Sequence, residues 1–173
     1  VGGWGGQEQL CDATIEFSAD EVEHTFVFLF SSDFKIHLFF AAGNEDADEM
    51  FSGKMYHTVR TGQGSILPDP PEELIGDVGT VHALRIGGGN VAFVYTDSAR
   101  QNLYYRTFTD DSTATLYTVP DPTLIIGSVT GAQDSSGRLH VLFGTFKFDE
   151  PANPTFYKIL YMNNVKGTWE EKE

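Results

Sequence analysis

The stretch "SSGRLHVLFGT" at 135–145, followed after a short insert by "YKILYMNNVKGTW" at 157–169, decides the fold. It contains a polar turn with a glycine, a run of alternating apolar residues, a second such run and a Gly-Thr-Trp close. This alternation is typical of β-strands with one buried face, and Gly, Asp and Ser favour the tight turns between strands. The stretch therefore predicts an antiparallel pair of strands.

The same order recurs twice upstream. Three central strands share a turn residue followed by alternating apolar residues that end on an aromatic: "FKIHLFF" at 34–40, "GNVAFVY" at 89–95 and "GRLHVLF" at 137–143. Each precedes a second strand with a tyrosine: "KMYHTV" at 54–59, "NLYYRT" at 102–107 and "KILYMN" at 158–163. Tyr56, Tyr104 and Tyr161 fall at equivalent places in the second strands, and His37 and His140 do so in the central strands. The period is roughly 50 residues, within the range of four-stranded propeller blades.

Further alternating runs complete the pattern at 25–30, 81–86, 114–119 and 125–130, while helix-period signals are almost absent. We therefore predict an all-β fold, a β-propeller-like domain of about three four-stranded antiparallel blades, with a β-sandwich as the alternative.

The blades set the expected domain organisation. The repeats are expected at about 10–62, 72–118 and 122–172 within a single domain 1–173. Because three blades are fewer than a closed propeller needs, the chain would belong to a longer one or its copies would pair into a larger ring. The inserts at 43–53 and 145–156 are expected to be loops at hairpin tips.

The charge balance narrows the choice of partner. The 173 residues include 11 basic and 25 acidic ones, which gives a net charge of −14. Such a surface repels a phosphate backbone, so nucleic acid is not an expected partner. No run approaches the roughly 18 consecutive apolar residues of a membrane-spanning helix, so no membrane span is expected either.

A family resemblance supports the propeller. The order "DSSGRLHVLFGT", "KILYMN", "KGTWEE" over 134–171 resembles the repeat of sialidase-type (BNR-type) and lectin-type β-propellers, and the resemblance extends to 80–118. In those repeats an Asp-Gly turn precedes a His-Val strand, and a Tyr strand precedes a Gly-Thr-Trp close. The sialidase Asp-box has a Trp shortly after its Gly, which "DSSGRLHV" lacks. The resemblance therefore implies the scaffold rather than sialidase activity.

The candidate binding residues are aromatic and basic side chains at the expected blade edges. Aromatic rings stack on the apolar face of a sugar while polar groups bind its hydroxyls. By residue type the candidates for binding carbohydrate are Trp4, Tyr105, Arg106 and Trp169, whose alternative role is packing between blades. Glycoside hydrolysis needs two carboxylates at a defined separation, and this cannot be read from the spacing. No catalytic residue is assigned.

The acidic loop "NEDADE" at 44–49 is the candidate metal site. Asp46, Asp48 and Glu49 offer closely spaced oxygen ligands, which suits calcium. The loop lacks the Gly at the sixth place and the Glu at the twelfth place of an EF-hand, and a solvated acidic loop is the alternative. No other cofactor is expected. For His37 and His140, repeat symmetry alone accounts for their recurrence.

These observations lead to a non-catalytic extracellular or cell-surface recognition module, with carbohydrate or a cell-surface glycan as its ligand and a homo-oligomer or polymer as its assembly. One alternative is a structural subunit of an extracellular polymer or ring, assembled by pairing of open strand edges. The other alternative is a fragment of a glycosidase.

Overall fold

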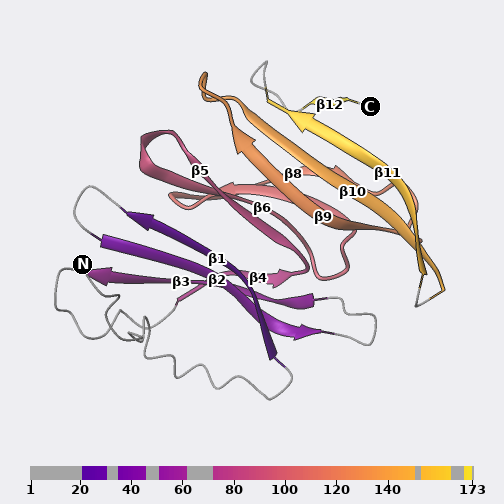
Figure 1. Ribbon diagram of the computed structural model, residues 1–173, viewed down its shortest axis with the longest axis horizontal. Helices are drawn as coiled ribbons and strands as arrows, with labels where there is room; N and C mark the ends of the chain where they lie inside the picture. The colour runs from indigo at the N-terminus through magenta and orange to yellow at the C-terminus, as the bar shows by residue number, and fades with distance from the viewer. Residues whose placement is uncertain are drawn as a thin grey trace, which may run out of the picture.

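The protein is built from three stacked β-sheets (Figure 1). The computed structural model describes the backbone of residues 21–30, 35–45, 51–61, 72–150, 153–164 and 170–172, and the side chains of 35–44, 51–59, 72–147 and 158–164. Within these ranges the only helical element is the 3-10 turn Gly87–Gly89. The expected all-β fold with three four-stranded antiparallel sheets is confirmed. None of the described segments forms a helix with the length and apolar character of a membrane span.

Each sheet is a meander, in which strands that are consecutive in the sequence pair antiparallel. The first sheet contains β1 (Glu21–Phe30), β2 (Lys35–Glu45), β3 (Phe51–Thr61) and β4 (Glu72–Val78). The second contains β5 (Val81–Ile86), β6 (Asn90–Thr96), β7 (Asn102–Thr107) and β8 (Asp110–Thr118). The third contains β9 (Leu124–Gln133), β10 (Leu139–Glu150), β11 (Asn153–Asn163) and β12 (Glu170–Lys172). In Figure 1 the second sheet lies between the first, at the lower left, and the third, at the upper right.

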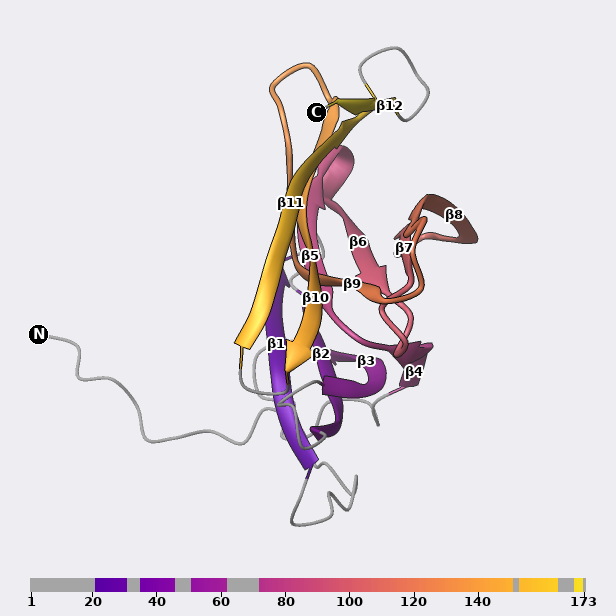
Figure 2. The same cartoon turned by 90° about the vertical axis from the view of Figure 1, so that its right-hand side faces the viewer.

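The first strands of the sheets face one another, as in a propeller. β5 contacts both β1 and β9. In the view at right angles, β4 and β8, the fourth strands of the first two sheets, lie on the same side of the molecule (Figure 2). In β-propellers, four-stranded sheets are arranged radially as blades, and the first strand of each sheet lies nearest the central axis.

One boundary of the expected repeats is wrong. The second repeat was expected to begin at 72, but β4 pairs with β3 through Met55↔Ile75 and His57↔Glu72, so the first sheet ends at 78. The sequence of β4, "EELIGDV", alternates poorly and only Ile75 and Val78 are buried. Pairing with β3 determines where β4 lies, and the alternation of apolar residues within a strand does not predict which strand it pairs with.

The two inserts expected as loops are mostly strand. β2 and β3 stay paired out to Glu45↔Phe51, and β10 and β11 out to Glu150↔Asn153. In the first hairpin Gly43 pairs with Gly53, and a Cβ atom on Gly43 would lie 2.2 Å from the carbonyl oxygen of Ser52. The two glycines let the backbones approach closely and the ladder continue.

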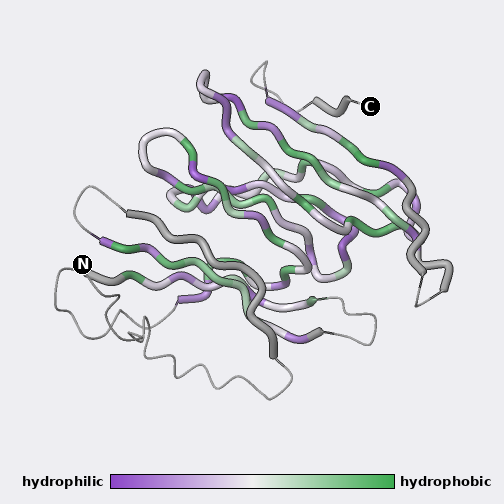
Figure 3. The backbone as a smooth tube through the Cα atoms, viewed as in Figure 1, coloured by the Kyte–Doolittle hydropathy of each residue, from purple (hydrophilic) through white to green (hydrophobic). Residues whose placement is uncertain are grey.

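Hydrophobic side chains fill both spaces between the sheets. Between the first and second sheets the core contains Phe39, Met55, Ile75, Val78, Val91, Phe93 and Tyr95. Between the second and third it contains, among others, Ala92, Val94, Leu103, Leu116, Ile126, Val141, Phe143 and Leu160. Hydrophobic stretches run along β2 and β10, and hydrophilic residues lie at the turn between β9 and β10 (Figure 3). Both faces of the middle sheet are therefore buried, which explains the continuous apolar run of β6.

Arg100 joins all three sheets at one point. Its guanidinium donates hydrogen bonds to the carbonyl oxygens of Phe51 (3.3 Å) and Gly79 (3.1 Å), and its own carbonyl accepts the N–H of Ile126 at 2.9 Å. The residue is 9 % exposed and has a positive φ of 55°. Asp97 holds the turn by accepting the N–H groups of Gln101 and Asn102. A buried arginine with carbonyl partners stabilises the stacking of the sheets.

The strand register corrects one repeat equivalence. Phe40 pairs with Tyr56 and Tyr95 pairs with Tyr104, but Phe143 pairs with Leu160. Tyr56 and Tyr104 therefore correspond to Leu160. Tyr161 lies one residue further along, on the opposite face of its sheet, and corresponds to His57 and Tyr105.

Candidate functional site

The third sheet has an open face, the one turned away from the second sheet. Leu142 on β10 and Ile159 on β11 are 44 % and 60 % exposed, and they are the only exposed large hydrophobic residues in the described part of the chain. Both border a groove of about 410 Å³, whose lining also includes Ser128, Val129, Thr130 and Phe146. None of the described residues that line the groove is charged. We call this surface the open face.

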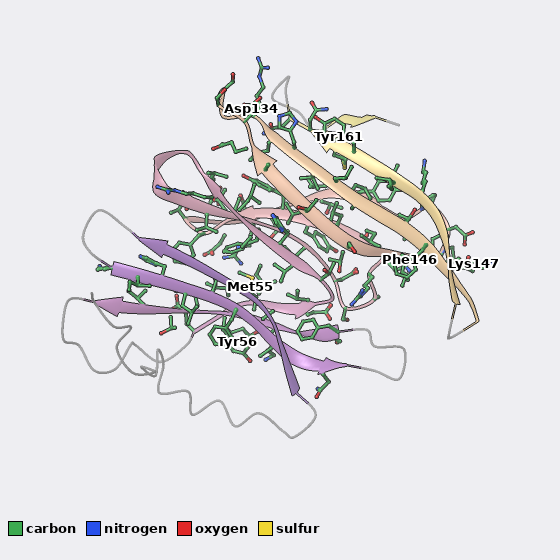
Figure 4. The ribbon with its side chains drawn as sticks, viewed as in Figure 1. Met55, Tyr56, Asp134, Phe146, Lys147 and Tyr161 are labelled. Atoms are coloured by element: carbon green, nitrogen blue, oxygen red, sulfur yellow. The ribbon has the colours of Figure 1, made fainter. Side chains whose placement is uncertain are left out.

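Three polar side chains form a hydrogen-bonded row on the third sheet. The Tyr161 hydroxyl lies 2.5 Å from Nδ1 of His140, and Nε2 of His140 lies 3.3 Å from Oδ2 of Asp134. The histidine and tyrosine rings are stacked with centroids 5.9 Å apart. The geometry fits a tyrosine that donates to His140 and a histidine that donates to the carboxylate. Figure 4 shows Asp134 and Tyr161 toward one end of the sheet and Phe146 and Lys147 toward the other.

Local backbone geometry holds Asp134 in place. Its Oδ1 accepts the N–H groups of Ser136 (2.8 Å) and Arg138 (2.9 Å), and Gly137 in the same turn has a φ of 80°. The hydrogen bond from the Arg138 N–H, with further ones from His140 and Ser136, keeps the pKa of the Asp134 carboxyl below its usual value. Asp134 is therefore an anion at neutral pH, fixed beside His140.

The first sheet carries a counterpart of this row. His37 and His140 share a register position, and Nδ1 of His37 lies 2.9 Å from Nε2 of His57, the counterpart of Tyr161. Nδ1 of His57 lies 3.1 Å from Oε1 of Glu72. His57 is 4 % exposed, and the rings of Phe39 and of Phe108, from the turn between β7 and β8, pack on it with centroid distances of 4.7 and 4.6 Å. This burial lowers the pKa of His57.

Two of the four predicted carbohydrate-binding residues lie in the described part of the chain, and they do not form a shared site. Tyr105 and Arg106 are neighbours on β7, so their side chains point to opposite faces of the second sheet. Tyr105 packs against the core shared with the third sheet, and burial raises the pKa of its phenol. Arg106 is 9 % exposed and donates hydrogen bonds to the Leu74 carbonyl (2.8 Å) and to Asp111 (2.6 Å). Both have the packing role that was the alternative.

The remaining predicted site residues lie outside the described residues. These are Trp4, Trp169 and the candidate calcium ligands Asp46, Asp48 and Glu49. Across the ranges that the structure describes, no group of three or more His, Cys, Asp or Glu side chains is placed to hold a metal ion.

The row of Asp134, His140 and Tyr161 was missed as a unit. "DSSG" at 134–137 was interpreted as a turn and His140 as a repeat position, and both interpretations describe the backbone well. The missing information was the strand register, because Tyr161 had been aligned with residues on the other face of the sheet. A one-residue shift in a strand exchanges the two faces.

Comparison with known proteins adds a fold relative. No family model and no curated protein matches the sequence. Among solved structures, a polysaccharide lyase described as an ulvan lyase, bound to -[GlcA(1-4)Rha3S]-, is similar over 84 % of this chain, with a TM-score of 0.59 and 13 % sequence identity. The match spans 39 % of that chain. At this identity the similarity shows a shared fold.

Proposed function

We propose that the protein is a non-catalytic carbohydrate-binding module with propeller-like architecture. The observation that carries the proposal is the row of Asp134, His140 and Tyr161 on the same sheet as the apolar groove. The solved structure with a similar fold holds a saccharide, which supports the same class of ligand. The resemblance of 134–171 to lectin-type repeats supports an extracellular or cell-surface setting.

The chemistry of the groove, together with the neighbouring row of Asp134, His140 and Tyr161, suits a sugar. A pyranose ring has an apolar face of C–H groups, which packs on side chains such as Leu142 and Tyr161, and hydroxyls at its edge. The Asp134 carboxylate accepts hydrogen bonds from such hydroxyls, and charge-assisted bonds of this kind are the stronger ones. Because the described lining of the groove includes no basic residue and the chain has a net charge of −14, we expect neutral sugars to bind better than sulfated or uronate-rich ones.

A binding role fits the row better than hydrolysis. Glycosidases place two carboxyl groups across the bond, roughly 5–5.5 Å apart when they retain configuration and roughly 6.5–9.5 Å apart when they invert it. The hydrogen-bonded row contains one carboxylate, Asp134, and hydrogen bonds keep the pKa of that carboxyl low. A carboxyl with a low pKa is a poor proton donor to a leaving group at neutral pH.

The test is glycan binding by matched variants. The wild-type chain is screened on a glycan array and its affinity for the strongest neutral hit is measured by calorimetry. Asp134→Asn removes the charge, and Tyr161→Phe removes the hydroxyl; a lost charge-assisted hydrogen bond of about 1.5–3 kcal/mol corresponds to roughly 10–150-fold weaker binding. Thr115→Ala, at an exposed position on β8, should bind like wild type.

Two outcomes would overturn the proposal. One is a wild-type chain that binds no glycan on the array. The other is an affinity that neither Asp134→Asn nor Tyr161→Phe reduces, which would put the sugar elsewhere on the protein. Hydrolysis of the bound glycan, abolished in Asp134→Asn, would instead favour the glycosidase alternative.

A further inference from the structure

The row of Asp134, His140 and Tyr161 has a fixed order of donors and acceptors. An ionised carboxylate only accepts hydrogen bonds, so Nε2 of His140, 3.3 Å from Oδ2 of Asp134, carries a proton. When the imidazole is neutral its other nitrogen is an acceptor, so the Tyr161 hydroxyl, 2.5 Å from Nδ1, donates to it. The proton of His140 and the proton of the Tyr161 hydroxyl are therefore both used within the row.

What the row still offers to a ligand is acceptors. Oδ1 of Asp134 accepts the N–H groups of Ser136 and Arg138, and Oδ2 accepts the proton of His140, so three of the roughly four lone-pair positions of the carboxylate are filled. The Tyr161 oxygen accepts no hydrogen bond within the row and keeps its lone pairs. The side chains of Asp134 and His140 are 33 % and 30 % exposed, so a ligand can reach them.

The charge of the row is negative. Hydrogen bonds, first of all the one from the Arg138 N–H, keep the pKa of the Asp134 carboxyl low, and the charge of the Arg138 side chain is the weakest of the causes. Among the described side chains, the ion-pair partner of Asp134 is His140. The strand β12, which pairs with this end of β11, adds two acidic residues and one basic residue, so it does not reverse the sign. A cationic donor is therefore the group that complements the row.

We propose that the row binds an amino sugar, whose protonated amine donates to Asp134 and whose neighbouring hydroxyl donates to Tyr161. This inference rests on the proposed carbohydrate binding and names the class of sugar. An ammonium group is cationic and has only donors, which matches an anionic row that offers only acceptors. The pyranose ring that carries the amine packs toward Leu142 in the apolar groove. The carbonyl of an acetamide, or a sulfate, has only acceptors to present and finds no donor in the row.

Matched oligosaccharides test the proposal. The probes are gluco- and galacto-configured tetrasaccharides that carry a hydroxyl, an acetamide or an amine at C2 and are otherwise identical. At about pH 7 an amine beside electron-withdrawing groups, like an α-amino group, is mostly protonated. In calorimetry with the wild-type chain, the amine members should bind about tenfold or more tightly than the hydroxyl members, the ratio that one charge-assisted hydrogen bond supplies. The acetamide members should bind most weakly.

A matched aspartate separates the row from the general charge of the protein, since a chain with a net charge of −14 attracts any cation. Asp134→Asn should remove the preference for the amine, and Asp110→Asn should keep it. Asp110 holds its turn in the same way, because its Oδ1 accepts the Ser112 N–H at 2.9 Å, and it lies on β8 of the second sheet. Both substitutions remove one negative charge, so an equal loss in both variants would overturn the inference.

Nuclear magnetic resonance tests the order of donors without any sugar. The nitrogen chemical shifts of the His140 ring should show the proton on Nε2, and Tyr161→Phe should weaken this preference, because Nδ1 loses its donor. A proton on Nδ1 of His140 in the wild-type chain would overturn the inference, since the Tyr161 hydroxyl would then be free to donate to a ligand.

The outcomes with sugars separate this inference from the proposed function. Hydroxyl or acetamide members that bind as tightly as the amine members would overturn the inference and leave carbohydrate binding in place. A chain that binds other glycans on the array but none of the tetrasaccharides would do the same. A chain that binds no glycan at all would overturn the proposed function, and the inference with it.

Discussion

The seam between the first two sheets and the open face of the third present the same pattern of side chains in two environments. His37 with His57, and His140 with Tyr161, occupy the same register positions and make the same kind of hydrogen bond between rings. In the seam, Phe108 covers the pair; on the open face, Leu142 and Ile159 beside the pair are exposed. The shared strand register gives both pairs the same local geometry, and the presence of a following sheet determines whether that geometry is buried or faces solvent.

The largest expected difference is in packing energy. Phe39→Ala in the seam should lower the free energy of unfolding by about 3–5 kcal/mol, because it leaves a cavity beside Phe93 and Met55. Leu142→Ala, at the equivalent position on the open face, should cost less than about 1 kcal/mol, because the side chain is already 44 % exposed. Urea unfolding at low protein concentration measures both. Equal decreases in the free energy of unfolding would mean that another part of the same chain buries Leu142 in solution.

The next largest effect is on stability, through the hydrogen bonds that Arg100 donates at the junction of the three sheets. Arg100→Ala leaves the buried carbonyl groups of Phe51 and Gly79 without their donor, and should destabilise the protein by about 2–3 kcal/mol. Arg85→Ala, at an exposed position on β5, should stay within about 0.5 kcal/mol of wild type. Thermal unfolding followed by circular dichroism compares the two. An Arg100→Ala protein as stable as wild type would show that Arg100 does not stabilise the stack.

The smallest effect is the pH dependence of the seam. Burial lowers the pKa of His57 in the folded state, so below the unfolded-state pKa of about 6.5 the unfolded chain binds a proton that the folded chain does not. Stability should therefore fall as the pH drops below about 6.5, by at most about 1.4 kcal/mol per pH unit for this group. Urea unfolding between pH 8 and pH 5 measures the slope. His57→Gln should reduce the slope of the free energy of unfolding against pH. An unchanged slope would mean that other titratable groups cause the pH dependence.

The strands were predictable where each one alternates strongly. The central strands at 34–40, 89–95 and 137–143 were also predictable, because each is a short run of apolar residues that ends on an aromatic. β4 and β12 were missed, since "EELIGDV" and "EEK" have little apolar alternation and are held by pairing with the strand beside them. Strand pairing is a property of the fold and leaves little trace in such short segments.

The candidate site was less predictable than the fold. Arg106 was chosen by residue type, but its position on β7 turns it toward the Leu74 carbonyl and Asp111, inside the molecule. Tyr161 was aligned with Tyr56 and Tyr104, one residue from its true register, which hid its contact with His140. Which face of a strand is open depends on the sheet that follows it, and single-strand patterns do not contain that information.

The most direct test of the account is the rate at which a thiol reagent labels two matched cysteines, with Cys11 replaced by serine. Met55→Cys and Ile159→Cys occupy equivalent positions in the seam and on the open face. The cysteine at 159 should react at least 100-fold faster than the one at 55, because Ile159 is 60 % exposed and Met55 is 2 % exposed. A cysteine at 159 that is as protected as the one at 55 would contradict the existence of the open face.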